Sequence, residues 1–473
     1  MTSYFVAIDS GSQSTKVSVI DEEGEVHGSA QVALRPYELG PGGRAVHPGD
    51  DLWDTVAVAS RQAMASFAGE SDDIVAVGLC GIRFCRALLD SDGQLTEPVM
   101  SWMDARVSQP LTRRAPDVAT VAGAGGYLSV RLTGSRRDST ASYQGMWPID
   151  PVARQWSADP AEVTRTGMPL ALLPQLVDPG GLLGHVTAEA SRQTDLPRGL
   201  PVYATGNDKA VEALGCGLLD PGTVLLSLGT YIASMTVGDE LSSDDDRYWV
   251  NTAAVPGRCL YESGGIRRGM WTVSWLSQLV TAAAPELVEP QALQEWLDKG
   301  ARSVPPGSDG LMTIPDWLPP GNARHRRGAI LGLDGSHGAH HLYRSVLEGI
   351  VLTMRGHTEA MEHALGRPRG RLLVSGGGSR SDLMSQIVAD VFGRQVERAR
   401  VADAAGLGAA ICAAVGHGTH DGFEAAVKAM TRPGEVVEPD PAAHRKYDQV
   451  MEVYTALPEF TDPMFQRMAA PGD

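Results

Sequence analysis

Four polar segments of the sequence have residue types and spacings that could bind a phosphorylated ligand and act on it. The first is the run Asp9-Ser10-Gly11-Ser12-Gln13-Ser14-Thr15-Lys16. Glycine permits a tight turn with exposed backbone N–H groups, and the side chains from Ser12 to Lys16 add donors for phosphate oxygens. Asp9 could hold a metal ion or its water shell. An ordinary polar hairpin loop explains the run equally well, and the P-loop pattern GxxxxGK[ST] is absent from the sequence.

The second segment is Thr205-Gly206-Asn207-Asp208-Lys209, which follows the apolar run 201–204. In α/β proteins, ligands bind at loops that follow strands. A carboxylate placed there, at Asp208, could accept the proton of a hydroxyl that attacks a nucleotide phosphate. The alternative is that Asp208 caps a helix, which is the better interpretation of this segment in isolation.

The third segment is Ser375-Gly376-Gly377-Gly378, between an apolar run and a helical pattern that starts at Leu383. Consecutive glycines allow a flat or charged ligand to approach the backbone, and a helix N-terminus favours anions. The GxGxxG spacing of a dinucleotide site is missing, and a flexible connection is the alternative. The small-residue run 404–410 nearby indicates close helix packing rather than a ligand site.

The fourth segment is Trp102-Met103-Asp104-Ala105-Arg106, with Arg83 and Phe84 upstream. An aromatic face contacts the C–H groups of a polyhydroxylated ligand, while charged groups bind its hydroxyls. A surface salt bridge beside a buried Trp102 is the better interpretation when this segment is taken alone. The histidines at 337, 340 and 341 lack acidic or Cys partners at ligand spacing, which indicates surface and packing roles.

The elements that must position these segments alternate between strands and helices, which predicts an α/β fold. The residues 4–8 and 16–20 form two apolar strand patterns around the first segment, and a helical pattern follows at 52–64. Near residue 218 the pattern restarts, with strands at 223–227 and 231–235 around the turn Leu228-Gly229-Thr230. Two similar halves that face one cleft explain this repetition, although strand-turn-strand hairpins are common enough for coincidence.

Composition limits the function classes further. The chain has 473 residues, which exceeds the roughly 250–300 residues of a single core, so two domains are expected. A net charge of -17 argues against nucleic-acid binding. Five cysteines without a CxxC pair indicate a reducing compartment. The N-terminus lacks a signal-peptide pattern, and the longest apolar run is shorter than the roughly 20 residues of a membrane span, so a cytoplasmic protein without membrane contact is expected.

Taken together and in this order, the segments resemble motifs of the FGGY family of carbohydrate kinases. The family pattern D-x-G-T-x-S-x-K/R resembles the run from Asp9 to Lys16, with Ser12 in place of Thr. The family segment that carries the catalytic Asp resembles 205–217, and the second phosphate loop S-L-G-T-S resembles 227–231. Further similarity at 327–333, 346–349 and 375–393 extends the resemblance over nearly the whole chain.

The resemblance implies an actin/hexokinase-like fold, with two duplicated ribonuclease-H-like domains at 1–218 and 219–473 around a cleft. It implies transfer of the ATP γ-phosphoryl group to a sugar or polyol hydroxyl, with Asp208 as general base and Asp9 as the Mg²⁺ residue. The implied phosphate-binding and adenosine-binding residues are Gly11, Ser12, Gln13, Ser14, Lys16, Gly229, Thr230, Gly376, Gly377 and Gly378. The implied substrate-binding residues are Arg83, Phe84, Trp102, Asp104 and Asp208.

Two departures from the family concern the substrate. Xylulokinases carry Gln-Met-His-Gly and glycerol kinases Gln-Arg-Glu where this chain has Ile82-Arg83-Phe84-Cys85. The helical insertion that usually follows the W-x-D-x-R segment is missing before Tyr127, so we expect either a more open pocket or one closed by a second subunit in a homodimer. The expected substrate is a ketopentose such as xylulose. The alternatives are glycerol or another three- to four-carbon polyol or ketose, and a non-catalytic nucleotide-binding sensor or scaffold.

Overall fold

The computed structural model describes residues 2–241, 245–283, 292–367, 370–401 and 403–469, and its first half is built on a six-stranded sheet. The two apolar runs around the first polar segment form an antiparallel pair in which Asp9 lies opposite Lys16. A buried third strand runs parallel to the first of them. The strand order is β13 (Leu182–His185), β14 (Pro201–Asn207), β6 (Ile74–Gly81), β1 (Tyr4–Ser10), β2 (Ser14–Asp21) and β3 (Val26–Ala33).

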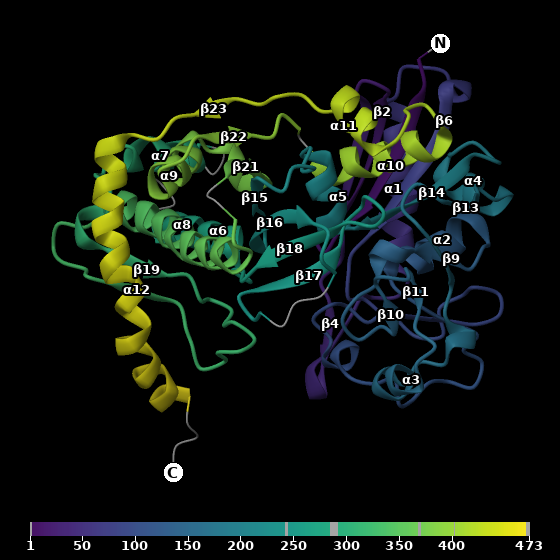
Figure 1. The fold of residues 1–473 in the computed structure, drawn as a ribbon, viewed down its shortest axis with the longest axis horizontal. Helices are drawn as coiled ribbons and strands as arrows, with labels where there is room; N and C mark the ends of the chain where they lie inside the picture. The colour runs from purple at the N-terminus through teal and green to yellow at the C-terminus, as the bar shows by residue number, and fades with distance from the viewer. Residues whose placement is uncertain (1, 242–244, 284–291, 368–369, 402, 470–473) are drawn as a thin grey trace.

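The second half repeats this arrangement in a seven-stranded sheet (Figure 1). The pair β15 and β16 is antiparallel, as β1 and β2 are, and β21 lies parallel to β15, as β6 does to β1. The predicted α/β fold with two duplicated halves is therefore confirmed. The strand order is β17 (Tyr248–Thr252), β18 (Cys259–Ser263), β16 (Ile232–Gly238), β15 (Thr223–Leu228), β21 (Arg371–Ser375), β22 (Val396–Arg398) and β23 (Val436–Val437).

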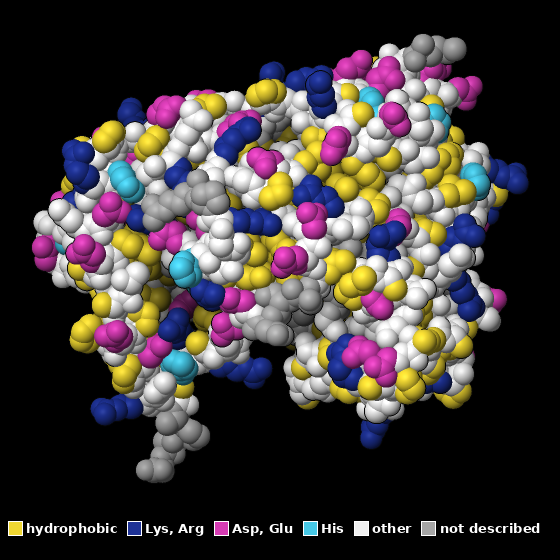
Figure 2. Space-filling view, viewed as in Figure 1, with side chains coloured by type: hydrophobic (Ala, Val, Ile, Leu, Met, Phe, Trp, Pro, Cys, Tyr) yellow, Lys and Arg dark blue, Asp and Glu magenta, His cyan; other side chains and the backbone are white. Residues whose placement is uncertain are grey.

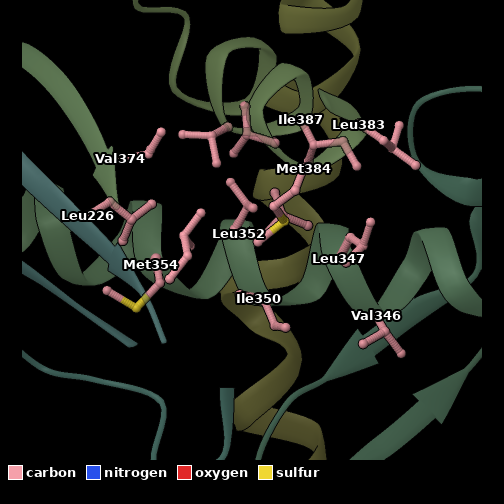
Figure 3. Close-up of a cluster of buried hydrophobic side chains, with 14 of the residues drawn as sticks. Leu226, Val346, Leu347, Ile350, Leu352, Met354, Val374, Leu383, Met384 and Ile387 are labelled. Carbon is pink, nitrogen blue, oxygen red and sulfur yellow. The ribbon is translucent and has the colours of Figure 1, made fainter. Parts of the chain in front are cut away.

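Helices cover both sheets with regularly spaced apolar residues. Helix α1 (Asp51–Ser66) buries Leu52, Val56 and Ala59 against the first sheet. The core of the second half lies between its sheet and two helices, α8 (Ala339–Ala364) and α9 (Asp382–Phe392). Figure 3 shows Leu226 and Val374 from the strands near the side chains of these helices. The other helices are α2 (Ala124–Thr133), α3 (Pro160–Thr166), α4 (Ala188–Thr194), α5 (Asp208–Gly215), α6 (Gly269–Ala283), α7 (Leu293–Ala301), α10 (Ala404–His417), α11 (Phe423–Met430) and α12 (Pro441–Ala469).

Short two-stranded pairs complete the fold. They are β4 (Glu38–Gly40) with β5 (Arg44–Val46), β7 (Ala87–Leu89) with β8 (Thr120–Ala122), β9 (Arg137–Ser139) with β12 (Gln175–Val177), β10 (Ile149–Asp150) with β11 (Gln155–Trp156), and β19 (Met312–Ile314) with β20 (Ala329–Leu331). Figure 2 shows acidic and basic side chains interspersed on the visible face. No described helix is both long and apolar enough to cross a membrane.

Helix α10 connects the two halves of the chain in an unexpected way. It lies between β22 and β23 of the second sheet in sequence, yet it packs against α5, β1 and β6 of the first half (Figure 1). One of its three glycines, Gly408, lies so close to α5 that an added Cβ would meet the Val211 carbonyl oxygen at 1.9 Å. The close helix packing predicted for 404–410 is therefore confirmed. A division of the chain at residue 218 remains a prediction, and α10 and α11 pack with the first half.

Candidate active site

Polar segments at the ends of strands of both sheets meet at a cavity of about 570 Å³, which we call the phosphate-side cavity. It lies between the β1–β2 turn, the β15–β16 turn, the loop after β21 and the start of α10. Eight of the predicted ligand residues that are separated in sequence line it together, which are Asp9, Gly11, Ser12, Lys16, Gly229, Thr230, Gly376 and Gly377. Asp208 also lines this cavity.

The β1–β2 turn and the β15–β16 turn face each other across this cavity. The first turn is closed by a hydrogen bond from the Gly11 N–H to the Ser14 carbonyl oxygen at 3.1 Å. The Gln13 side-chain amide donates to the Thr230 hydroxyl at 3.1 Å, which links the two turns directly. The Ser14 hydroxyl accepts a hydrogen bond from Gln31 at 2.8 Å and does not line the cavity. Of the first segment, Asp9, Gly11, Ser12 and Lys16 are therefore the residues that reach the phosphate side.

Asp9 has the properties expected of a residue that holds a cation. Its side chain is buried, and its Oδ1 atom has no hydrogen-bond partner among the described residues. Burial, followed by repulsion from Asp403, raises the pKa of Asp9 to about 8, and Asp208 and Glu212 add to that repulsion. No group of three or more described His, Cys, Asp or Glu residues could hold a metal alone. An Mg²⁺ ion at Asp9 would therefore need phosphate oxygens or water as its other ligands.

The loop after β21 approaches the β15–β16 turn through glycine. Gly376 has a φ of 81°, a value that residues other than glycine rarely adopt. An added Cβ at this position would meet the Leu228 backbone at 2.8 Å. Gly377 borders open space, whereas Gly378 is buried against Leu228 and Met270 and does not line the cavity. Gly376 and Gly377 are thus the members of the triple glycine that a ligand can contact.

Asp208 is the first residue of α5, but it does not cap that helix. The N-cap is Asn207, whose side-chain oxygen accepts hydrogen bonds from the backbone N–H groups of Lys209 and Ala210, both at 3.1 Å. Its side-chain amide also donates to the Ala141 carbonyl oxygen at 2.9 Å, which fixes the start of the helix. The Asp208 carboxylate is 31% exposed and lines the cavity. The helix-cap alternative therefore applies to Asn207 and leaves Asp208 available for chemistry.

A second, smaller cavity of about 190 Å³ lies on the other side of Asp208, and we call it the acceptor-side cavity. Four of the five predicted substrate residues line it, which are Arg83, Phe84, Trp102 and Asp208. The Arg83 guanidinium donates two hydrogen bonds to the Glu262 carboxylate at 2.6 and 2.9 Å, and its Nε atom lies 3.8 Å from the Asp208 Oδ1 atom. This buried ion pair joins the loop after β6 in the first half to β18 in the second half.

An aromatic pair also spans the two halves at the acceptor-side cavity. The Phe84 ring is stacked on Trp249 of β17 with the centroids 5.8 Å apart. The Arg83 guanidinium lies 4.8 Å from the Trp249 ring centroid, within the range of a cation–π contact. Phe84 has φ of 63°, an unusual value for a bulky residue that the packing must hold in place.

The structure corrects the expectation for Asp104. Its side chain is fully buried, and its Oδ2 atom accepts hydrogen bonds from the Ala45 N–H at 2.9 Å and from Arg106 at 2.8 Å. Its Oδ1 atom accepts from the backbone and side chain of Arg106. Asp104 does not line either cavity. The carboxylate therefore stabilises the loop that carries Trp102 rather than facing a ligand.

Sequence reasoning missed several residues that complete the site. Glu262 binds Arg83, Glu212 and Asp403 line the phosphate side, and Tyr231, Trp249 and Arg267 line the acceptor side. The signal for Glu262 was present in the sequence, because a charged residue inside the apolar strand pattern Cys259-Leu260-Tyr261-Glu262 requires a buried partner. No local pattern distinguished the aromatic residues from ordinary core residues.

Comparison with known proteins agrees with this geometry. The chain matches the N-terminal domain of the FGGY family of carbohydrate kinases over residues 4–115 and the C-terminal domain over residues 224–417. It is 41% identical to an uncharacterized sugar kinase, YgcE, of Escherichia coli K12 over 98% of this chain and 95% of that protein. It is 25% identical to a xylulose kinase of Staphylococcus epidermidis RP62A over 96% of both chains.

Among solved structures, the xylulose kinase of Rhodospirillum rubrum is 28% identical, with a TM-score of 0.82 over 98% of this chain and 99% of that chain. The chain therefore belongs to the FGGY family of carbohydrate kinases, which are phosphotransferases, and it has the actin/hexokinase-like fold of that family.

Proposed function

We propose that the protein transfers the γ-phosphoryl group of ATP to a hydroxyl of a small neutral sugar, a ketopentose such as xylulose in the first place. The observation that carries this proposal is the position of Asp208, which lines both the phosphate-side and the acceptor-side cavity. A base at that boundary can orient an acceptor hydroxyl on one side and receive its proton as the phosphoryl group arrives from the other.

The residues around Asp208 provide positioning and charge rather than covalent catalysis. The backbone at Gly11, Gly229 and Gly376 allows close approach of a phosphate chain, and the hydroxyls of Ser12 and Thr230 are hydrogen-bond donors on both cavities. When bound at Asp9, Mg²⁺ would neutralise phosphate charge. Holding the reactants in line and excluding water account for much of the rate of such a reaction.

The acceptor-side cavity supports a small neutral substrate. Its volume of about 190 Å³ is below the range of roughly 300–1,000 Å³ that is typical for drug-sized ligands. The charge of Arg83 is balanced by Glu262 and that of Lys209 by Glu212. Arg267 and Asp208 add one charge of each sign to the lining, so the cavity offers donors and acceptors to hydroxyls without a net charge that would select an acid. The xylulose kinases among the relatives favour a ketopentose.

A second candidate is a kinase for glycerol or another three- to four-carbon polyol or ketose. Arg83 and the small cavity favour it, and glycerol kinases occur among the relatives at 26% identity. Phe84 argues against glycerol itself, because it stands where glycerol kinases carry the Glu of Gln-Arg-Glu and stacks on Trp249. A non-catalytic sensor or scaffold remains the alternative of a different class.

A coupled assay of ADP release tests these proposals. The purified protein is incubated with Mg·ATP and a panel of ketopentoses, aldopentoses, tetruloses, glycerol and dihydroxyacetone. We expect the highest kcat/KM with a ketopentose. A preference for a three- or four-carbon acceptor would replace the first candidate with the second. No increase above the rate with ATP alone, together with measurable ATP binding by calorimetry, would favour the sensor.

A further inference from the structure

Five residues line both cavities, and they mark the boundary that a transferred phosphoryl group must cross. They are Ser12, Asp208, Lys209, Thr230 and Tyr231. Three of them carry hydroxyl groups and one carries the carboxylate assigned as the base. Lys209 is the one cation among these five.

Lys209 is held in place by contacts from both halves of the chain. Its Nζ atom donates to the Glu212 Oε2 atom at 2.8 Å and to the Ser227 hydroxyl of β15 at 2.7 Å. Glu212 in turn accepts hydrogen bonds from Ser227 at 2.7 Å and from Ser375 of β21 at 2.6 Å. The side chain of Lys209 is 11% exposed, so its position is determined by these partners rather than by solvent.

The ammonium group keeps one donor for a ligand. It has three N–H donors, and two of them are used by Glu212 and Ser227 within the part of the chain that the structure describes. Burial lowers the pKa of Lys209, but the attraction and hydrogen bond of Glu212 outweigh it, so the pKa is raised and the group stays charged. A fixed cation with one free donor is thus present where the two cavities meet.

The other basic residues of the phosphate-side cavity are placed differently. Lys16 lies 3.6 Å from Asp403, and Arg398 pairs with Asp382 and Glu435. Neither these residues nor Arg380 lines the acceptor-side cavity. They can bind the phosphate chain of the nucleotide, but on this geometry they do not reach the boundary itself.

We propose that Lys209 is a catalytic residue whose ammonium group contacts the equatorial oxygens of the phosphoryl group during transfer. This inference rests on the proposed kinase reaction. In that reaction the acceptor oxygen forms a bond to the γ-phosphorus, its proton passes to Asp208, and the bond to the bridging oxygen breaks to leave ADP. Lys209 keeps its proton throughout and stabilises the charge on the transferred group.

The competing explanation is structural, because the Lys209–Glu212 unit also fastens α5 to β15 and β21. Glu212→Gln separates the two roles, since it weakens the same fastening but keeps the lysine, whose Nζ atom can still donate to the Gln carbonyl oxygen and to Ser227. A catalytic role predicts a much larger loss of kcat in Lys209→Met than in Glu212→Gln. A structural role predicts similar losses of kcat in both variants, and these losses should follow the decrease in their free energies of unfolding.

The experiment measures two reactions of each variant, acceptor phosphorylation and the slow hydrolysis of ATP by water without acceptor. Both cross the same boundary, so Lys209 can be tested even if no sugar of the panel is an acceptor. We expect Lys209→Met to lower the rate constants of both by about 10²–10³-fold, a typical loss for one electrostatic stabiliser. The Kd values of ATP and acceptor should change less than about threefold. Lys428→Met, at an exposed position of α11, is the control.

Chemical rescue completes the test. Methylammonium added to Lys209→Ala should restore part of the lost rate, and Lys209→Arg should retain more activity than Lys209→Met. Rates of Lys209→Met within threefold of wild type would overturn the inference, as would losses equal to those of Glu212→Gln without rescue. Wild-type hydrolysis without transfer to any acceptor would contradict the proposed substrate class alone, and the absence of both reactions would contradict both proposals.

Discussion

The two cavities that share Asp208 are built in different ways. The phosphate-side cavity is lined by glycines and hydroxyl residues of tight turns together with charged side chains, most of them contributed by short contiguous segments. The acceptor-side cavity is lined by long and aromatic side chains whose positions depend on partners in the other half, such as Arg83 on Glu262 and Phe84 on Trp249. A site for a ligand common to a whole family can be made from backbone, whereas discrimination among acceptors depends on side chains.

The difference has a thermodynamic consequence. The backbone turns of the phosphate side are held mainly by local hydrogen bonds and by strand pairing within each sheet. The walls of the acceptor side need both halves to be in contact, because the ion pair and the aromatic stack each take one residue from each half. Acceptor recognition should therefore depend on closure of the two halves more strongly than nucleotide recognition does.

Asp208→Asn should have the largest effect, because it affects the residue common to both cavities. The amide cannot accept the acceptor proton, so we expect kcat to fall by about 10³-fold with small changes in both KM values. Steady-state kinetics with varied ATP and varied acceptor would measure this. The exposed Asp72→Asn serves as control, and full turnover by Asp208→Asn would remove the assignment of the base.

Glu262→Gln should affect binding at the acceptor-side cavity and leave binding at the phosphate-side cavity nearly unchanged. Loss of one partner from a buried ion pair leaves Arg83 misplaced, a change that costs about 3–5 kcal/mol in other proteins. We expect the acceptor KM to rise by about 10–100-fold while the Kd of ATP, measured by calorimetry, stays within twofold.

The matched control is Glu362→Gln, which breaks the buried pair of Glu362 and Arg394 far from both cavities. It should lower stability to a similar extent without a change in acceptor KM. An equal rise of the ATP and acceptor KM values in Glu262→Gln would contradict the prediction that this ion pair acts on the acceptor side alone.

Gly376→Ala should affect the phosphate side by a smaller amount. The alanine must adopt a positive φ and its Cβ must displace the Leu228 backbone, which costs about 1–3 kcal/mol. We expect the KM for ATP to rise by about tenfold and the acceptor KM to stay nearly constant. Gly335→Ala is the control, since a Cβ there meets nothing within 4 Å. An unchanged KM for ATP would show that the loop tolerates a shift.

Asp138→Asn should have the smallest effect on catalysis and a pH-dependent effect on stability. Asp138 accepts a hydrogen bond from the Ser139 N–H. The segment that follows it fixes the start of α5, because the Ser139 hydroxyl donates to the Thr205 carbonyl oxygen and the Ala141 carbonyl oxygen accepts from the Asn207 side chain. Burial raises the pKa of Asp138 from 3.8 to about 6. Below pH 3.8 the carboxyl group is protonated in both states. Between about pH 4 and 6 it is ionised only in the unfolded chain, so stability falls as pH rises.

The neutral Asn side chain does not titrate, so Asp138→Asn does not lose stability in this way as the pH rises. Its free energy of unfolding relative to wild type should therefore increase by up to about 3 kcal/mol between pH 4 and pH 7. Urea denaturation at several pH values would measure the difference. The exposed Asp92→Asn should show the pH dependence of the wild type. A constant difference between Asp138→Asn and wild type across this range would mean that Asp138 does not titrate as described.

Much of the phosphate side could be predicted from the sequence. A tight turn between two strands needs glycine and small polar residues at adjacent positions, so the first loop and the β15–β16 turn were visible as contiguous patterns. The strand and helix periodicities around them indicated the duplicated α/β fold. Asp208 was singled out through its motif, although only the structure showed that Asn207 takes the capping role. The Asp208 carboxylate instead lies between the Lys209 N–H and the Arg83 guanidinium, at 3.0 and 3.8 Å.

The sequence by itself thus determined the local elements, the repeated strand-turn-strand plan and the family motifs, because these depend on spacing along the chain. The tertiary structure decided which side chains face the ligand. It placed Glu262 on Arg83 across 179 residues, turned Asp104 inward onto Arg106, and brought Lys209 to the boundary of both cavities. Contacts of this kind depend on how the two halves pack together, and that packing has no periodic signature in the chain.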